Sequence, residues 1–372
     1  MHTLVISDLH LGIRSGADVL ARPQALDVLL GRLEDVRRLV LLGDVLELRG
    51  GPARDALAVA EPVMRAIGDA LGPGGEVLLS AGNHDHAIVA GWLDWRGRRE
   101  RPQALGLEQR IAPRSASWIA KRLAGWLAPA KVEVAYPGVW LREDVYAMHG
   151  HYLDAHSEVP TLERITAGLM GRLVGDLPDP ATPDDYEARL APIYAWIHAS
   201  AQRAAPRRRA AGGDAPAARI WQALEGARPR RSLRRYAFVA PIRLALLAAN
   251  RAGLGPLRPQ ISRPALRAGG LRALAETARR LRLGADHVVV GHTHRTGMLP
   301  GDDASQWRTA AGAQLHNAGS WVFESHFMDT DRPGSDPYWP GGAIALGDDG
   351  PPQLQRLLGG VPASVLAGTP RW

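Results

Sequence analysis

The 372-residue sequence contains no cysteine, and this absence removes several kinds of chemistry. Disulfide bonds, thiolate zinc sites and cysteine nucleophiles are all excluded. Any metal ion must therefore be held by histidine, aspartate, glutamate or asparagine, ligands that favour the harder divalent ions.

The sequence also lacks a long hydrophobic run. No stretch of about 18 uninterrupted apolar residues occurs, which argues against a membrane-spanning helix but leaves surface attachment open. The first segment, MHTLVISDLH, has no basic residues before its short apolar run, so it is typical of a first strand and not of a signal peptide. We expect a cytoplasmic protein, with peripheral membrane contact as an option.

Lysine is scarce, and the charge is unevenly distributed. Only Lys121 and Lys131 are lysines, so nearly all 45 basic residues are arginine. Residues 155–285 hold 22 arginines, no lysine and 10 acidic residues, a net charge of +12, whereas the rest of the chain carries −5. This difference predicts a core of residues 1–154 and 286–372 and an Arg-rich insertion of residues 155–285.

Five short apolar runs each end in a polar cluster. The runs are TLVIS, RRLVLL, EVLLSA, VYAM and HVVV. Continuous apolar strands with functional loops at their carboxyl ends are typical of an α/β sheet that is covered on both faces. Between the first two runs, residues 21–36 have the apolar spacing of a helix with one buried face.

The insertion shows no strand pattern. The segment TPDDYEARLAPIYAWIHASA predicts a helix that Thr182 caps, with Pro183 at its first position and acidic residues in its first turn. A second helix is predicted over SRPALRAGGLRALAETARRLRLG, with Ser262 as its cap and Gly284 as its stop. Strand patterns return at residues 313–322 and 341–346.

Residue types that bind metals gather at the five strand ends. A single Asp-x-His is a weak signal, and Gly-Asn-His-Asp alone can be a polar turn, but five clusters in order indicate a site. Two histidines separated by one residue project to the same side of an extended segment. The clusters are Asp8-Leu9-His10, Gly43-Asp44-Val45-Leu46-Glu47, Gly82-Asn83-His84-Asp85, His149-Gly150-His151 and Gly291-His292-Thr293-His294.

The order and spacing of these clusters resemble the calcineurin-like metallophosphoesterase superfamily, whose pattern is D-x-H, G-D, G-N-H-[DE], H and G-H-x-H. The resemblance covers about residues 1–154 and 286–358, and LHNAGSW is similar to a strand that follows the last motif in many members. It implies an α/β fold, a two-layer β-sandwich flanked by helices, with two metals at the edge of the sheet, and it leaves the helical insertion, which we expect to be a cap, unmatched.

The resemblance also implies the metal ligands. Asp44 would bridge two divalent ions. Manganese is the first choice for such oxygen and nitrogen ligands, and iron or zinc is compatible. Glu47 is expected to be a hydrogen-bonding partner, and His151 the less favoured ligand of its pair. The other ligands would be Asp8, His10 and His294 at one site and Asn83, His149 and His292 at the other.

His84 is expected to be catalytic and not a ligand. In the family, the histidine of G-N-H-D contacts the scissile phosphate or protonates the leaving oxygen, and the adjacent acid orients it. We therefore assign Asp85 to the orientation of His84. The implied reaction is hydrolysis of a phosphoester or pyrophosphate bond by a hydroxide that bridges the metals.

Three classes of function are consistent with the sequence. The pairing of SDLHLG with GDVLEL resembles the branch that contains UDP-2,3-diacylglucosamine pyrophosphatases, although that branch commonly has arginine at the position of His84; a nucleotide- or lipid-linked phosphate is one expected substrate. A nucleic-acid phosphodiesterase is the alternative, weakened because residues 203–235 contain one tryptophan amid their arginines. A non-catalytic scaffold is the third, although every matched ligand position is filled.

The insertion contains a segment that suits an amphiphilic partner. RRSLRRYAFVAPIRLALLAANRAGLGPLRP combines a basic edge with an apolar stretch, as expected for contact with lipid phosphates or an anionic membrane surface. An internal helix of the cap with a solvated arginine face explains the same pattern. Because the insertion leaves the core just after His149 and re-enters it just before His292, we expect it to cover the metal site.

Overall fold

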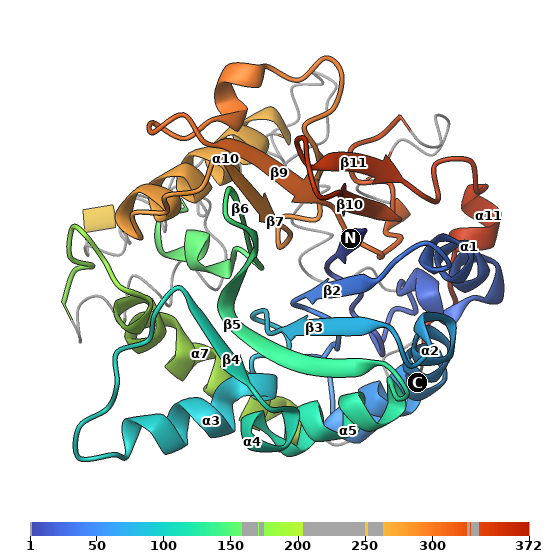
Figure 1. Cartoon of the computed structure of the whole chain (residues 1–372), viewed down its shortest axis with the longest axis horizontal. Helices are drawn as coiled ribbons and strands as arrows, with labels where there is room; N and C mark the ends of the chain where they lie inside the picture. Colours follow the sequence, from blue (N-terminus) through green and yellow to red (C-terminus); the bar gives the residue numbers. More distant parts are fainter. Residues whose placement is uncertain are drawn as a thin grey trace, which may run out of the picture.

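The computed structural model describes residues 2–157, 170, 175–203, 250–251, 263–325, 328 and 335–371. Parallel strands alternate with helices in its first part, so the mixed α/β class predicted from the sequence is confirmed. Figure 1 shows the strands in the middle of the molecule with helices around them. Within these residues, no helix is both long and apolar enough to cross a membrane.

Eleven strands of the described residues form one sheet. Their order is β11-β10-β1-β2-β3-β5-β6-β7-β9-β8, and β4 pairs with β5. Each apolar run for which the sequence predicts a strand forms a strand in the structure. These strands are β1, β2, β3, β6, β7, β9 and β10. The strands are β1 (Thr3–Ile6), β2 (Arg38–Leu42), β3 (Glu76–Ser80), β4 (Glu108–Ile111), β5 (Lys131–Arg142), β6 (Val145–Met148), β7 (His287–Val290), β8 (Thr296–Gly297), β9 (Gln314–Ala318), β10 (Gly342–Leu346) and β11 (Gln353–Arg356).

Strand β5 belongs to both halves of the sheet. Its beginning pairs with β3 in the register Val77↔Val132, and its end pairs with β6 in the register Val139↔Ala147. At the start of the second stretch, where Gly138 pairs with Met148, a Cβ added to Gly138 would lie 2.3 Å from the hydroxyl oxygen of Tyr146. The passage of β5 from one half to the other therefore requires a residue without a side chain.

The two ends of the sheet also approach each other. A Cβ added to Gly342 in β10 would lie 2.1 Å from the carbonyl oxygen of Ala318 in β9. A buried cluster contains residues from both halves, among them Val5, Val289 and Ile344. The sheet therefore curls round an apolar core, whereas its division into two layers stays a prediction.

Helices cover the outer face of the first half of the sheet. Their apolar residues, such as Leu29, Ile67 and Leu123, pack in one cluster with Ile6 and Leu41 of the strands. The neighbouring strand residues face the inner cluster, which is why these parallel strands are apolar on both sides. The helices are α1 (Pro23–Leu33), α2 (Ala53–Leu71), α3 (Ala87–Gly97), α4 (Pro113–Ala116), α5 (Trp118–Trp126) and α11 (Ala363–Leu366).

Two described helices belong to the insertion, α7 (Pro183–Arg203) and α10 (Arg263–Arg280). The predicted cap of α7 is present, because Thr182 N–H donates to Asp185 Oδ2 at 2.7 Å and Asp185 N–H faces Thr182 Oγ1 at 3.4 Å. Helix α10 ends before Gly284, and its expected cap lies outside the described residues. The amphipathic segment 230–259 also lies outside them, apart from residues 250 and 251.

Glu187 connects α7 to the core through buried polar contacts. Its carboxylate accepts hydrogen bonds from the hydroxyls of Tyr136 at 2.5 Å and Tyr152 at 2.6 Å, and it lies 3.0 Å from His86 Nε2. Burial raises the pKa of Glu187, but His86 and the two tyrosines outweigh it and lower the pKa below its ordinary value. An ionised acid of the insertion is therefore anchored among residues of the core.

Replacement of Glu187 by alanine should destabilise the protein by about 3–5 kcal/mol, because its buried partners would be left unpaired. Thermal denaturation followed by circular dichroism measures this as a lower Tm. The matched control is Glu276→Ala in α10, whose ion pairs with Arg279 and Arg280 are partly exposed and contribute less than about 1 kcal/mol. Equal losses of Tm in the two variants would contradict the anchoring role.

The low pKa of His316 in β9 predicts that the stability of the protein depends on pH. Burial, together with His287 at 3.1 Å between ring nitrogens, lowers the pKa of His316 to about 4. The folded state then binds fewer protons than the unfolded state, so stability is lost as the pH falls from about 6.5 towards about 4. His316→Gln should therefore show a smaller fall in Tm between neutral and mildly acidic pH than the wild type. An identical fall in both proteins would rule this out.

Candidate metal centre

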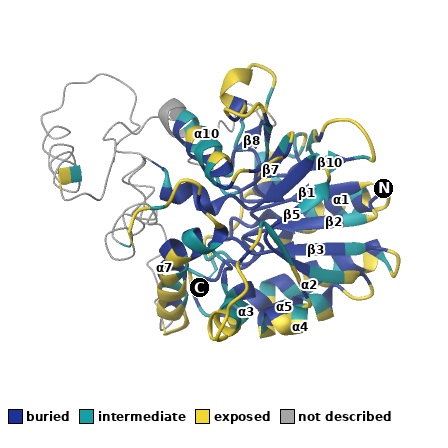
Figure 2. Cartoon of the chain, turned by 60° about the vertical axis from the view of Figure 1, so that its left-hand side comes forward, coloured by how far each residue is buried: buried dark blue, intermediate teal, exposed yellow. Residues whose placement is uncertain are grey.

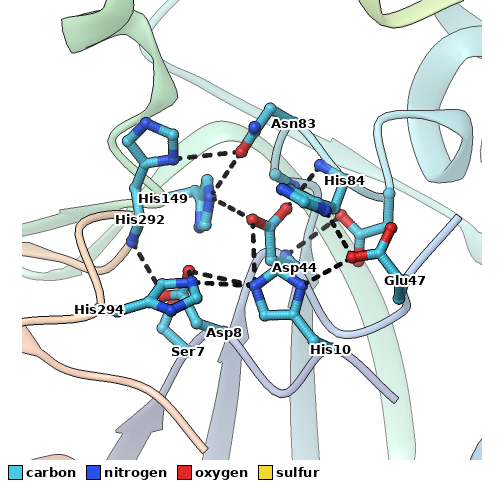
Figure 3. Close-up of polar contacts among 12 residues, drawn as sticks. Ser7, Asp8, His10, Asp44, Glu47, Asn83, His84, His149, His292 and His294 are labelled. Carbon is cyan, nitrogen blue, oxygen red and sulfur yellow. Dashed lines mark hydrogen bonds and ion pairs between the residues drawn. The ribbon is translucent and has the colours of Figure 1, made fainter. Parts of the chain in front are cut away.

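The polar clusters after β1, β2, β3, β6 and β7 meet at one edge of the sheet (Figure 3). Because β1, β2 and β3 run parallel, as do β6 and β7, their carboxyl ends lie side by side. Backbone hydrogen bonds join the loops: His10 N–H donates to Asp44 O at 2.8 Å, and Gly291 N–H donates to His149 O at 3.0 Å. The five loops singled out by the sequence therefore form one site.

One cluster consists of Asp8, His10 and His294. His10 Nε2 lies 3.0 Å from His294 Nε2 and 3.9 Å from Asp8 Oδ1, and His294 Nε2 lies 3.3 Å from that oxygen. Asp8 Oδ1 is buried and has no hydrogen-bond donor among the described residues. Three donor atoms thus face a common point and lie within 4.8 Å of one another, as the ligands of a cation would.

A second cluster consists of Asp44, His149 and His292, with Asn83 beside them. His149 Nε2 lies 3.2 Å from Asp44 Oδ2. The side-chain oxygen of Asn83 lies 3.1 Å from His292 Nδ1 and 3.4 Å from His149 Nε2. Turning the amide would let its nitrogen donate to His292 and Asp44, but the inward oxygen is the atom that can bind a cation.

Asp44 lies between the two clusters. Its Oδ2 atom is 3.7 Å from His10 Nε2 in the first cluster and 3.2 Å from His149 Nε2 in the second. It also forms a third possible group with His10 and His84. One carboxylate can therefore contact ions at both positions, which is the arrangement that the bridging assignment expects.

Backbone strain is concentrated at these residues. Left-handed conformations cost a non-glycine residue about 1–3 kcal/mol and are typical of functional sites. Among the described residues, Arg282 is the one other non-glycine residue with a positive φ. The strained positions are Asp8 (58°), His10 (46°), Asp44 (51°), His292 (64°) and His294 (57°).

Two glycines of the motifs let the backbone approach the carboxylates. A Cβ added to Gly82 would lie 2.2 Å from Asp44 Oδ1, and one added to Gly291 would lie 2.0 Å from Ser7 Oγ and 2.3 Å from Asp8 Oδ2. Any side chain at either position would displace an acid of the site. The motifs GNHD and GHTH therefore begin with glycine because no side chain fits at these two positions.

The charges of the site keep its acids ionised. Burial by itself raises the pKa of Asp8, but His149, His10 and His294 hold that pKa well below its ordinary value. The pKa of Asp44 is lowered in the same way, with His149 and His84 outweighing burial. Buried carboxylates, imidazoles and one amide make a donor set that fits divalent ions, which would replace protons as the neutralising charge.

The structure gives Asp85 a different role from the expected one. Its carboxylate is fully buried and accepts backbone N–H groups, so it joins the loop after β3 to the loop after β2. Burial, and next to it the charge of Asp44, raises the pKa of Asp85 to about 6. The donors are Gly82 at 2.7 Å, Asp44 at 3.2 Å, Val45 at 2.7 Å and Leu46 at 3.3 Å.

Glu47 is the acid that contacts His84. Its Oε2 atom lies 2.7 Å from His84 Nδ1 and 3.2 Å from His10 Nδ1. The expectation that Glu47 is a hydrogen-bonding partner agrees with these contacts, but the orientation of His84 falls to Glu47 and not to Asp85. A carboxylate on Nδ1 fixes the tautomer and directs Nε2 away from the partner.

The motifs do not identify two further residues at the site. Arg49 Nη1 lies 3.3 Å from His84 Nε2, and Asp154 Oδ1 lies 3.0 Å from His292 Nε2. Each follows a motif in the same loop, in GDVLELRG and HGHYLD respectively. His151 is also buried here, with its ring stacked on that of Tyr136, and burial and His149 lower its pKa.

No family model and no curated protein matches this sequence. Solved structures similar to it include a dimetal phosphatase from Danio rerio, with 13% identity over 94% of this chain and 93% of that chain and a TM-score of 0.33. A cold-active protein tyrosine phosphatase of a psychrophilic Shewanella species has 15% identity over 95% of this chain and 80% of that chain, with a TM-score of 0.28. A point mutant of a cold-active protein tyrosine phosphatase has 15% identity over 96% of this chain and 78% of that chain, with a TM-score of 0.31. At TM-scores this low, these similarities support no conclusion about the chain.

We expect the purified protein to bind about two divalent ions per chain. Asp44→Ala should reduce both occupancies, because its carboxylate faces both clusters, whereas His294→Ala should remove about one ion. Elemental analysis after loading with manganese and dialysis measures the content. His2→Ala, at an exposed residue, is the control and should keep the wild-type content. A wild type that retains no ion, or only one, would refute the dinuclear assignment.

Proposed function

We propose that the protein is a dinuclear-metal phosphoester hydrolase of the calcineurin-like type, with a core that forms a two-layer β-sandwich. The observation that carries the proposal is the position of the Asp44 carboxylate between two clusters of histidine and aspartate. Two such sites together can clamp the attacking and leaving oxygens of a phosphoryl group. The bond cut would be a phosphoester or a pyrophosphate.

The residues of the two clusters divide between two ions. Manganese is the first choice for this donor set, with iron or zinc as alternatives. When bound, the ions would polarise the phosphoryl oxygens and activate water for attack. Glu47 accepts a hydrogen bond from His10 Nδ1, and the Leu42 carbonyl accepts one from His149 Nδ1 at 2.9 Å. These contacts fix the tautomers in which Nε2 faces inward. One site would be Asp8, His10, Asp44 and His294, and the other Asp44, Asn83, His149 and His292.

His84 would protonate the leaving oxygen. Its side chain is 26% exposed at the mouth of the site, unlike the buried Asp8 and His149. With Glu47 on Nδ1, the doubly protonated ring would present its second proton on Nε2 once the Arg49 guanidinium, 3.3 Å from that nitrogen, has turned to the phosphate. Arg49 would then bind a phosphate oxygen while His84 acts on the leaving group. Asp85 supports both steps indirectly, because it holds the turn that carries His84.

The insertion would act as a cap that selects the substrate. Helix α7 borders the end of the loop after β2, where Ala53 N–H donates to Gln202 Oε1 at 2.8 Å. The insertion of residues 155–285 would favour an amphiphilic phosphate, either nucleotide- or lipid-linked, over a small one. A cytoplasmic enzyme that contacts anionic membranes fits this substrate class.

A substrate panel tests the proposal. Manganese-loaded protein is compared on an aryl phosphomonoester, an aryl phosphodiester, a nucleotide pyrophosphate, a lipid-linked pyrophosphate and a single-stranded oligonucleotide. Turnover that Asp44→Ala abolishes supports a metal-dependent hydrolase. Cleavage confined to the oligonucleotide would favour a nucleic-acid phosphodiesterase, and the absence of all turnover would favour a non-catalytic scaffold.

His84→Ala should retain both ions but lose roughly 10²- to 10⁴-fold in kcat on the best substrate with a poor leaving group. The loss should be smaller on an aryl ester, whose leaving group hardly needs a proton. His2→Ala serves as the control for both substrates. If the two losses are equal, His84 binds the phosphate and does not act as a general acid.

A further inference from the structure

Three tryptophans of the described residues are more than half exposed. They are Trp95 on α3 (56%), Trp118 on α5 (60%) and Trp196 on α7 (65%). One exposed tryptophan needs no explanation, but α3 contacts α5, so Trp95 and Trp118 lie on neighbouring helices (Figures 1 and 2). Large exposed apolar groups that gather in one region mark an interaction surface.

Trp95 and Trp118 lie beside the same junction between helices. A Cβ added to Gly91 in α3 would lie 3.2 Å from the carbonyl oxygen of Ala116 in α4. Trp95 follows Gly91 by one turn on the same stripe of α3, and Trp118 begins α5 directly after α4. The two tryptophans therefore belong to segments that meet at this junction, although they are not neighbours in the sequence.

Basic residues surround these two rings. Residues 91–126 contain eight arginines and lysines but three acids. The Arg99 guanidinium lies 4.8 Å from the centre of the Trp95 ring. Arg110 forms ion pairs with Glu108 and Glu133. The other exposed cations of this segment outnumber its exposed acids, Asp94 and Glu100. The exposed cations are Arg98, Arg99 and Arg101 after Trp95 and Arg114, Lys121 and Arg122 around Trp118.

A surface depression of about 360 Å³ lies between α4, α5 and the start of β5. Its two cations are Arg114 in α4 and Lys121 in α5, before and after Trp118 in the sequence. The other side chains are small and apolar, so the depression can hold a phosphate together with a short apolar stem. Its lining is Ala112, Pro113, Arg114, Lys121, Ala124, Ala130 and Val132.

We propose that the α3–α5 face, defined by Trp95, Trp118 and the cations around them, docks on a bilayer that contains anionic phospholipid. Tryptophan rings favour the boundary between headgroups and acyl chains, and clustered cations are attracted to an anionic leaflet. The depression would receive a headgroup phosphate. Because Arg99 already covers the Trp95 ring, this face suits a bilayer better than stacked bases of single-stranded nucleic acid.

Sedimentation of the full-length protein with vesicles tests the proposal. Vesicles of phosphatidylcholine and phosphatidylglycerol should bind the wild type, vesicles of phosphatidylcholine alone should not, and added salt should weaken binding. The double variants Trp95→Ala with Trp118→Ala and Lys121→Glu with Arg122→Glu should each reduce the apparent affinity by about tenfold or more.

Matched controls separate this surface from the rest of the chain. Trp196→Ala removes an equally exposed ring from α7, and Arg54→Glu reverses a cation on α2 that is 81% exposed. Both should bind vesicles as the wild type does. The double variants should keep wild-type turnover of a soluble aryl ester, so failure of docking is distinguishable from failure of the proposed hydrolase activity.

Three results would overturn the docking surface. The first is equal binding of the wild type to vesicles with and without phosphatidylglycerol. The second is undiminished binding by both double variants, which would assign membrane contact to another part of the chain. The third is tighter binding of a fluorescent single-stranded oligonucleotide than of anionic vesicles, with loss of that binding in the same variants.

Discussion

The site depends on β5, the strand that belongs to both halves of the sheet. The loops that carry Asp8, Asp44 and Asn83 end strands of the first half, whereas His149 and His292 follow strands of the second. Neither half alone holds both clusters. Because β5 pairs with β3 at its beginning and with β6 at its end, it fixes the distance between the two sets of loops. The absence of a side chain at Gly138 makes this passage sterically feasible.

Two acids outside the ligand set hold the site in place. Asp85 uses its carboxylate to join the loops after β2 and β3 through four backbone N–H groups, and Glu47 fixes the rings of His10 and His84. These contacts offset part of the cost of left-handed backbone at the predicted ligands. These surrounding contacts therefore hold the acids of the site close together and keep their backbone in the left-handed conformation.

In our proposal, the insertion and the α3–α5 face concern the substrate and not the reaction. Glu187 anchors α7 among residues of β5 and η2 (His151–Ala155), next to the loop that carries His149. Changes in the position of α7 would therefore reach the edge of the metal centre. The α3–α5 face lies on the helices that follow the GNHD loop, and the proposed membrane contact there would bring the protein close to lipid-linked phosphates.

The sequence by itself determined the α/β class, the strands that carry the site and the loops that meet there, because each of these depends on local apolar runs and on residues close together in the chain. It did not reveal β5, because the polar beginning of this segment and Pro137 are untypical of a strand. Pairing with the neighbouring strands makes it one. It assigned the wrong acid to His84, since neighbouring side chains such as His84 and Asp85 need not point the same way. The contacts of Glu47, Arg49 and Asp154 join loops or rings distant in the chain. Only the tertiary structure decides such pairs, because they depend on how the strand ends are placed in space.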